Sequence, residues 1–436
     1  MKKLWEKNYN TDELLESFTV GQDRELDLNL VKYDALGSIA HAKMLAKVGL
    51  LTEAESTQLV AGLQEIVQSA ENGEFVIEKG VEDVHSQIEL ILTGKYGDIG
   101  KKIHSGRSRN DQVLTALKLF AKHELQETAF LIKDLFHLLQ SLSDRYQDVL
   151  IPGYTHMQVA MPSSFGLWFG AYAESLSDDL IMLKAASQLV DKNPLGSAAG
   201  YGSSFPLDRE LTTKEMGFSS LNYNVVYAQM TRGKMEKTTA IALSIVAATL
   251  SKLAMDACLY NGQNFGFLKL PDEFTTGSSI MPHKKNPDGF ELVRAKCNKL
   301  QALPIELTMV LNNLPSGYHR DLQVTKESFI PAFTTIKDCL RMTISMLENI
   351  SVDKSVASNE KYADMYSVEL VNQLVLEGMP FRDAYKEVGQ RIATGDYKAP
   401  DSLNHVHLGS LGNLGNKQIR EQFENTFAYY LSSSDE

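Results

Sequence analysis

The segment GSSIMPHKKNPDG, residues 277–289, gathers groups that could carry out acid–base chemistry. Ser278 follows a flexible Gly277, Lys284 lies a short reach away, and Asn286 supplies an amide. Because glycine and proline oppose regular helix and strand, the segment is predicted to be a loop. A serine beside fixed cations and free backbone N–H groups can have its alkoxide stabilised, which makes it a candidate catalytic group. A solvated basic linker is the alternative that composition leaves open.

A second polar segment, HSGRSRNDQ at 104–112, stands where a long helix is predicted to begin. Ser108 or Asn110 would cap that helix. Capping alone does not explain Arg107 and Arg109 at the same helix start, where free N–H groups already favour an anion. Capping and anion binding are equally good interpretations of this segment.

A third segment, GYTHMQ at 153–158, follows Pro152 and is predicted to be a turn leading into a helix. A single histidine in such a turn, here His156, is more often a structural residue than a catalytic one. The segment is therefore a weak indication by itself.

These loops must be positioned by helices, because apolar residues recur at spacings of three and four along most of the chain. Convincing alternating strands are scarce. The pattern predicts an all-α protein whose long helices form a bundle, with apolar faces wide enough to be shared between chains. The long helices are predicted at about 107–151, 163–192, 234–260, 291–314 and 325–349.

Breaks in this pattern divide the 436 residues into three regions. Residues 1–102 are predicted to form an N-terminal helical domain, and residues 103–350 the central long-helix bundle with the catalytic loop at 271–289. Residues 351–436 are predicted to form a small C-terminal helical domain.

Composition limits the class of partner and the compartment. With 43 Lys and Arg against 55 Asp and Glu, the net charge of -12 argues against a nucleic-acid partner. The longest uncharged run, 238–251, is too short to cross a bilayer, and the N-terminus has no secretory signal pattern. Three widely spaced cysteines have no metal-ligand spacing. These features predict a cytoplasmic protein that binds no membrane and no metal.

The loop motifs resemble those of a known family. GSSIMPHKKNP matches the GSxxMxxKxN signature of the fumarase/aspartase superfamily. Within it, HSGRSRNDQ and GYTHMQ are similar to the HTGRSRNDQ and GYTHLQ of argininosuccinate lyases, and GYHRDLQVTKE at 317–327 is similar to their TYNKDLQEDKE. The resemblance runs from about Phe18 to Arg382.

The resemblance implies cleavage of a C–N bond by β-elimination, here of argininosuccinate to arginine and fumarate, the last step of arginine biosynthesis. It implies no metal and no organic cofactor. Ser278 would take the proton, Lys284 and Asn286 would bind the succinyl carboxylates, and His156, paired with Glu291, would be the family's charge-paired histidine.

The resemblance also implies a set of substrate-binding residues, a fold and an assembly. The fold would be a central bundle of long helices in a homotetramer, with each active site shared between three chains. An isolated protomer would then be inactive. The remaining binding residues would be Thr19, His85, Arg107, Asn110, Thr155, Tyr318, Gln323 and Lys326.

Several positions depart from the family pattern. Where relatives carry NSxDAxSxRD, this chain reads NVVYAQMTRG, which keeps Arg232 but places Tyr227 and Gly233 at two acidic positions. His283 replaces the usual glutamine, as in adenylosuccinate lyases. The alternatives are therefore a sister enzyme, such as adenylosuccinate lyase or fumarase, and a non-catalytic structural protein like the lens crystallins of this family.

Overall fold

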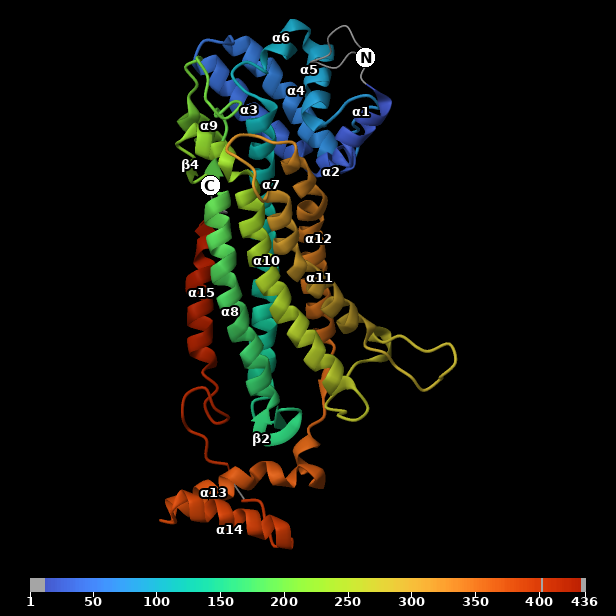
Figure 1. Ribbon diagram of the computed structural model, residues 1–436, viewed down its shortest axis with the longest axis vertical. Coiled ribbons are helices and arrows are strands. Elements are labelled where there is room, and N and C mark those ends of the chain that lie inside the picture. Colours follow the sequence, from blue (N-terminus) through green and yellow to red (C-terminus); the bar gives the residue numbers. More distant parts are fainter. Residues whose placement is uncertain (1–11, 401–402, 433–436) are drawn as a thin grey trace.

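The computed structural model describes residues 12–400 and 403–432, and these are mostly helical (Figure 1). Long helices run through the middle of the molecule, shorter helices gather at the N-terminal end, and further helices lie across the other end. This arrangement confirms the predicted all-α fold. The long helices are α7 (Arg109–Arg145), α8 (Phe165–Val190), α10 (Val225–Asn261), α11 (Asp288–Leu311) and α12 (Asp321–Glu348).

The start of α7 is fixed by its own side chains. Ser108 is the N-cap, and together with Asp111 it forms a capping box in which each side chain accepts a hydrogen bond from the other's backbone N–H. Further along α7, apolar residues such as Leu117, Leu125 and Leu139 are fully buried against α8 and α12. Their spacing is that of one helix face, and their burial, at roughly 25 cal/mol per Å² of apolar surface, holds the bundle together.

The N-terminal helices form a core of their own. Residues such as Leu45, Leu63 and Leu92 are buried in it, and α3 also packs on α7 at the end of the bundle. The helices of this region are α1 (Glu13–Val20), α2 (Asp23–Leu26), the 3-10 turn η1 (Asp27–Asn29), α3 (Val31–Lys47), α4 (Glu53–Glu71), α5 (Val84–Tyr96) and α6 (Asp98–Lys102).

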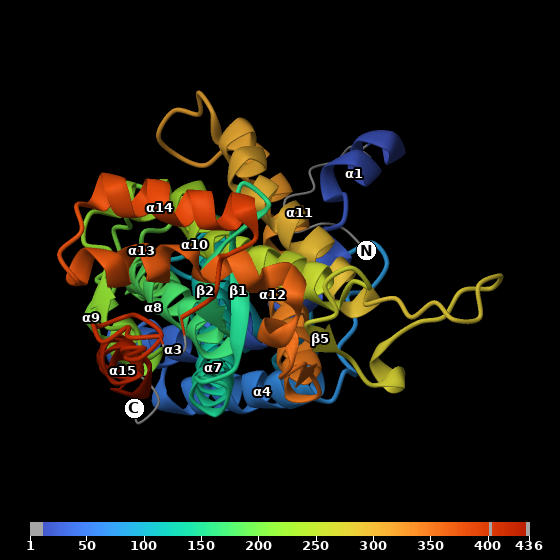
Figure 2. The ribbon, with the colours of Figure 1, turned by 90° about the horizontal axis from the view of Figure 1, so that it is seen from below.

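The C-terminal region divides into two parts. After the 3-10 turns η3 (Val356–Ser358) and η4 (Glu360–Tyr366), helices α13 (Ser367–Leu376) and α14 (Phe381–Thr394) pack side by side across the end of the bundle (Figure 2). Helix α15 (Asn416–Ser432) instead lies along α7 and α8, where the Phe423 ring stacks on Phe136 at 3.8 Å. Residues 351–436 were predicted to form one small domain, but α15 packs on the central bundle instead.

The segment that follows α7 is a β-hairpin, so the predicted turn into a helix at 153–158 was wrong. Strands β1 (Leu150–Thr155) and β2 (Gln158–Ser164) pair antiparallel, and α8 begins only at Phe165. The two residues of the turn, His156 and Met157, both have positive φ, as a type I′ hairpin turn requires. No glycine marks this turn, which is why the sequence did not reveal it.

The other strands are two-residue pairs between loops, and two short helical elements complete the described chain. Strand β3 (Lys192–Asn193) pairs with β4 (Ser220–Leu221), and β5 (Leu268–Lys269) pairs with β6 (Ser351–Val352). Helix α9 (Arg209–Glu215) and the turn η2 (Asp272–Phe274) lie in connecting segments.

Helix α10 begins earlier than predicted because it contains a break. Arg232 has an extended ψ of 134°, and Gly233 has a φ of 80°. A side chain at residue 233 would also meet Leu311 Cδ2 at 2.3 Å. Only glycine fits both constraints, so the chain can turn there and resume the helix.

Candidate active site

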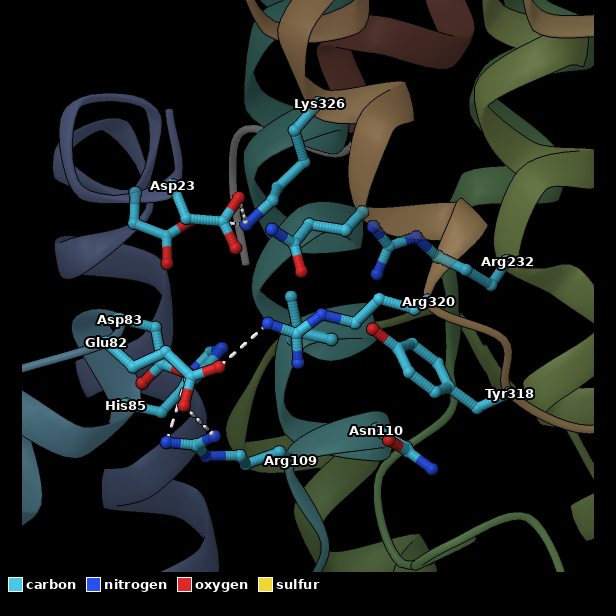
Figure 3. Close-up of a pocket in the computed structure, with 13 residues that line it drawn as sticks. Asp23, Glu82, Asp83, His85, Arg109, Asn110, Arg232, Tyr318, Arg320 and Lys326 are labelled. Atoms are coloured by element: carbon cyan, nitrogen blue, oxygen red, sulfur yellow. Dashed lines mark hydrogen bonds and ion pairs between the residues drawn. The ribbon is translucent and has the colours of Figure 1, made fainter. Parts of the chain in front are cut away.

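A pocket opens where the N-terminal helices meet the end of the bundle (Figure 3). The starts of α5, α7 and α12, the helix α2 and the break in α10 all contribute to it. Charged side chains of both signs dominate its walls. The lining residues are Asp23, Asp27, Glu82, Asp83, His85, Arg109, Asn110, Val113, Arg232, Tyr318, Arg320, Gln323 and Lys326.

Five of the predicted site residues meet in this pocket, namely His85, Asn110, Tyr318, Gln323 and Lys326. Within the described chain, the Asn110 amide and the Tyr318 hydroxyl have no hydrogen-bond partner, so both are free to bind a ligand. Since they come from α7 and from the loop before α12, segments that are distant in the sequence converge in this pocket.

Lys326 is held between two carboxylates. Its Nζ lies 2.7 Å from an oxygen of Asp23 and 2.7 Å from an oxygen of Asp27. Burial would lower the pKa of Lys326, but Asp27 and Asp23 outweigh it and raise that pKa. The pKa of Asp23 rises to about 6, because burial outweighs the nearby Lys326. Lys326 is therefore charged, and its charge is balanced within the protein.

Glu82 joins two arginines from different elements. It accepts hydrogen bonds from Arg109 at 3.1 Å and from Arg320 at 2.9 Å. Burial would raise the pKa of Glu82, but Arg320 and Arg109 lower it below its usual range. The two guanidinium groups are thus fixed at the pocket wall by a carboxylate.

Thr19, one of the predicted binding residues, uses its backbone to hold two neighbouring side chains. Its carbonyl oxygen accepts hydrogen bonds from Gln323 at 2.8 Å and from Arg320 at 2.7 Å. Its hydroxyl donates to the Leu15 carbonyl of α1 at 2.8 Å. Thr19 does not line the pocket; it ties α1 to the start of α12.

Arg107 lies behind the pocket. It is 8% exposed, and its Nη1 donates to the Ser38 hydroxyl at 2.8 Å. Its neighbour Arg109 faces the pocket instead and pairs with Asp83 at 3.3 Å as well as with Glu82. Of the two arginines in the segment 104–112, only Arg109 stands where it can reach a ligand in this protomer.

The remaining predicted residues lie away from this pocket. Thr155 and His156 are exposed at the tip of the β1–β2 hairpin, toward the opposite end of the bundle. Ser278, Lys284 and Asn286 lie on the loop that projects from the side of the bundle, drawn in yellow in Figure 1. No ion pair joins His156 to Glu291 of α11 among the described residues of the protomer.

The predicted loop at 277–289 is observed as far as Pro287, because α11 already begins at Asp288, and the loop has some internal order. Thr276 and Asn286 pair across its base, and Lys285 forms an ion pair with Asp272. The Ser278 hydroxyl accepts a hydrogen bond from the Met281 N–H at 3.1 Å. Lys284 is exposed. The loop thus holds Ser278 and Lys284 out from the side of the bundle.

Sequence reasoning missed the acidic half of the pocket and Arg320. Asp23 and Asp27 stand four residues apart in a helical segment, a spacing that puts both on one face and could have predicted a shared partner. Glu82 and Asp83 directly precede the motif of His85. In residues 12–400 and 403–432, no group of three or more His, Cys, Asp and Glu side chains is placed to hold a metal ion.

Known proteins resemble this chain in sequence along most of its length. The model of a family described as lyase matches residues 5–302. An argininosuccinate lyase of Parabacteroides distasonis is 62% identical over 418 residues, 96% of this chain and 94% of that protein. The argininosuccinate lyase of Thermotoga neapolitana is 42% identical over 390 residues, 89% of this chain and 98% of that protein.

Solved structures share the fold. EDDS lyase in complex with formate superposes with a TM-score of 0.76 at 20% identity, covering 98% of this chain and 92% of that one. Class II fumarase from Schistosoma mansoni gives 0.75 at 18% identity and covers 90% of each chain. These likenesses show that the long-helix bundle is a fold shared with solved structures. The match to the family model identifies the chain as a lyase of that family. Within it, the chain belongs to the argininosuccinate lyase family and is a carbon–nitrogen lyase.

Proposed function

We propose that this enzyme cleaves argininosuccinate to arginine and fumarate. The observation that carries the proposal is the pocket with both signs of charge, in a chain of this family. Argininosuccinate has three carboxylates, an ammonium group and a guanidinium group. Arg232, Arg320 and His85 suit the carboxylates, while Asp83 and Glu82 suit the cationic groups.

The elimination needs a base, a group that holds the carbanion and a proton for the leaving nitrogen. Ser278 takes the proton from the carbon beside a succinyl carboxylate. The electron pair passes through the aci-carboxylate, which Lys284 and Asn286 stabilise, and then forms the fumarate double bond. The C–N bond breaks, its electrons stay on nitrogen, and either His156 or Ser278 protonates that nitrogen.

The reaction proposed here needs more than one chain. In the protomer, the pocket, the projecting loop with Ser278 and the hairpin with His156 lie in three separate places. A homotetramer whose helices run in opposite directions would bring a hairpin and a loop from other chains to each pocket. Glu291 of α11 and Thr155 of the hairpin would enter the site in the same way, and Glu291 would then pair with His156.

The same assembly accounts for the apolar surface of α10. Helix α10 is the one described helix that is long and apolar enough to cross a membrane, and half of its most apolar window is buried inside the protomer. Neighbouring chains of the tetramer would cover the remaining surface. We accordingly place the enzyme in the cytoplasm.

Fumarate release tests the proposal directly. The purified protein is mixed with argininosuccinate, and separately with adenylosuccinate, and the ultraviolet absorbance of fumarate is followed. Release from argininosuccinate alone is expected. Release from adenylosuccinate alone would overturn the substrate assignment and point to His283 and Tyr227 as specificity residues. No release from either would favour a structural role.

A further inference from the structure

Behind the pocket, a buried carboxylate and a buried histidine form a pair. His85 of α5 lines the pocket and is 6% exposed, and its Nδ1 donates a hydrogen bond to Asp34 of α3. Asp34 is 2% exposed and is not among the lining residues. The carboxylate thus contacts only the side of the imidazole that faces away from the pocket.

Asp34 is held in place by donors from two other residues, Gln112 and Ser38. Gln112 of α7 donates to it at 2.9 Å, and the Ser38 hydroxyl donates at 3.3 Å. Arg107 in turn donates to Ser38 and stabilises the charge on Asp34 from a distance. Burial would raise the pKa of Asp34, but His85 and Arg107 lower it. Arg107, which the sequence suggested as a ligand contact, serves in the protomer to support this carboxylate.

The other ring nitrogen of His85 is unused. In the described part of the chain, Nε2 is buried and has no hydrogen-bond partner. A buried polar group without a partner is costly, and more so when it is charged. Since His85 lines the pocket, a ligand oxygen is the natural acceptor for an Nε2–H.

A second buried histidine, His41, differs from His85 in its hydrogen-bond partner and in its charge. His41 of α3 is fully buried, and its Nε2 lies 2.9 Å from the Ser105 carbonyl. Burial and the nearby Arg107 lower its pKa to about 3, so His41 is neutral. His85 differs in having a carboxylate partner. Burial would lower its pKa too, but Asp34, Asp83 and Asp27 raise it.

We propose that Asp34 is a positioning residue that keeps His85 in its imidazolium form, so that Nε2–H donates a charge-assisted hydrogen bond to a substrate carboxylate. The proposal deepens the function proposed above and rests on it for the identity of the ligand. Without the carboxylate, a neutral imidazole with a proton on Nδ1 would offer only a lone pair at Nε2, which repels an anion.

The charged groups that face His85 come from several elements. Asp27 lies on η1, Asp83 is the N-cap of α5, and His104 follows α6. Asp34, Asp83 and Asp27 therefore favour a positive charge on His85, and His104 opposes it. Burial and the nearby Arg107 lower the pKa of His104 itself. Replacement of Asp34 removes the carboxylate that contacts the ring and leaves Asp27 and Asp83 to act from farther away.

The test uses fumarate, which does not react when arginine is absent, as the probe of the assembled enzyme. Its dissociation constant is measured by calorimetry from roughly pH 6 to pH 9, a range that spans the ordinary histidine pKa of about 6.5. The wild type is expected to bind equally at each pH. Asp34→Asn is expected to bind about tenfold more weakly at the alkaline end and to recover as His85 is protonated at the acid end.

Two outcomes would overturn the proposal: wild-type affinity of Asp34→Asn at every pH, or a loss of the same factor at every pH, which would mean a merely structural role. His104→Gln is the matched control, since it removes a histidine that faces His85 but does not line the pocket, and its affinity for fumarate should not change.

If Asp34→Asn does not assemble, the fumarate affinity of His85→Gln tests the proposal instead. A loss of fumarate affinity that is the same at both ends of the pH range supports a permanently charged His85, and a loss that vanishes at the alkaline end overturns it. Turnover of argininosuccinate by the wild type is measured beside the binding. An enzyme that binds fumarate as expected but does not cleave argininosuccinate would refute the proposed function and leave the Asp34–His85 pair intact.

Discussion

Glu236 binds Arg232 and the backbone of Gly233 at the same time. Its Oε1 lies 2.7 Å from Arg232 Nε, and its Oε2 accepts the Gly233 N–H at 2.6 Å. Arg232 also donates to the Leu322 carbonyl of α12 at 2.9 Å. The carboxylate thus fixes the break in α10 and the arginine that reaches the pocket.

Glu236→Gln is therefore expected to destabilise the protein, because it leaves a buried guanidinium without its counter-charge. Loss of one partner of a buried ion pair costs roughly 3–5 kcal/mol. The free energy of unfolding should fall by about that amount in denaturant titrations. Glu306→Gln, on the exposed part of α11, is the control and should change little. Equal stability of the two variants would contradict the role of Glu236.

Gly233→Ala tests the backbone break. An alanine there must adopt a φ of 80° and would bring its Cβ to 2.3 Å from Leu311 Cδ2. Gly217→Ala is the matched control, because Gly217 has a φ of 65° but no atom within 4 Å of the added Cβ. We expect Gly217→Ala to cost about 1 kcal/mol from the backbone alone and Gly233→Ala clearly more. Leu311→Ala should partly restore Gly233→Ala in thermal melts.

The buried carboxyl group of Asp179 on α8 makes the stability of the folded protein depend on pH. It is 3% exposed, and burial raises its pKa to about 7, with a smaller contribution from Asp178. The folded state thus holds its proton more tightly than the unfolded chain. The stability from that protonated form is complete below the unfolded pKa near 4 and is lost as the pH rises toward 7.

Asp179→Asn should therefore raise the melting temperature at pH 8 and leave it unchanged at pH 4. On the shift given above, the gain at pH 8 is on the order of 2–4 kcal/mol. Asp178→Asn, at the exposed neighbouring position, should have a small effect at both pH values. A gain for Asp179→Asn that is the same at pH 4 and pH 8 would show that the carboxylate is not the cause.

The proposed division of the site among chains predicts complementation between inactive variants. Ser278→Ala removes the proposed base and should lower turnover by roughly 100- to 10,000-fold, whereas Ser279→Ala should not. His156→Asn removes the proposed histidine of the hairpin. When the two variants are unfolded together and refolded, some sites receive Ser278 from one chain and His156 from another. Turnover well above that of either variant is expected, and its absence would mean that each site takes both residues from one chain.

The sequence predicted the long helices because their apolar residues repeat along one face, and each predicted helix matches an observed one to within several residues, apart from the earlier start of α10. It did not predict the hairpin, since His156 and Met157 adopt positive φ without a glycine. It did not predict the path of α15, because a helical period does not say which surface the helix covers.

The sequence predicted only part of the site, because motifs mark single residues but do not show which distant residues come into contact. Tyr318 and Lys326 stand in a motif that the family resemblance marks, whereas Asp34 acts through His85, which lies far from it in the chain. Which buried carboxylate meets which cation depends on how α3, α5, α10 and α12 pack, and no local pattern carries that information. Arg107 and Arg109 illustrate the limit: they are two residues apart, yet one lies behind the pocket and the other faces it.

The stacking of Phe423 on Phe136 has a consequence for how the chain is made. The N-terminal core is formed almost entirely by residues 31–103 and can close while synthesis continues. The central core needs Phe423, Phe427 and Tyr430 of α15, which are synthesised after all five long helices of the bundle. Its apolar interior therefore stays open to chaperones and to other nascent chains until α15 has been made.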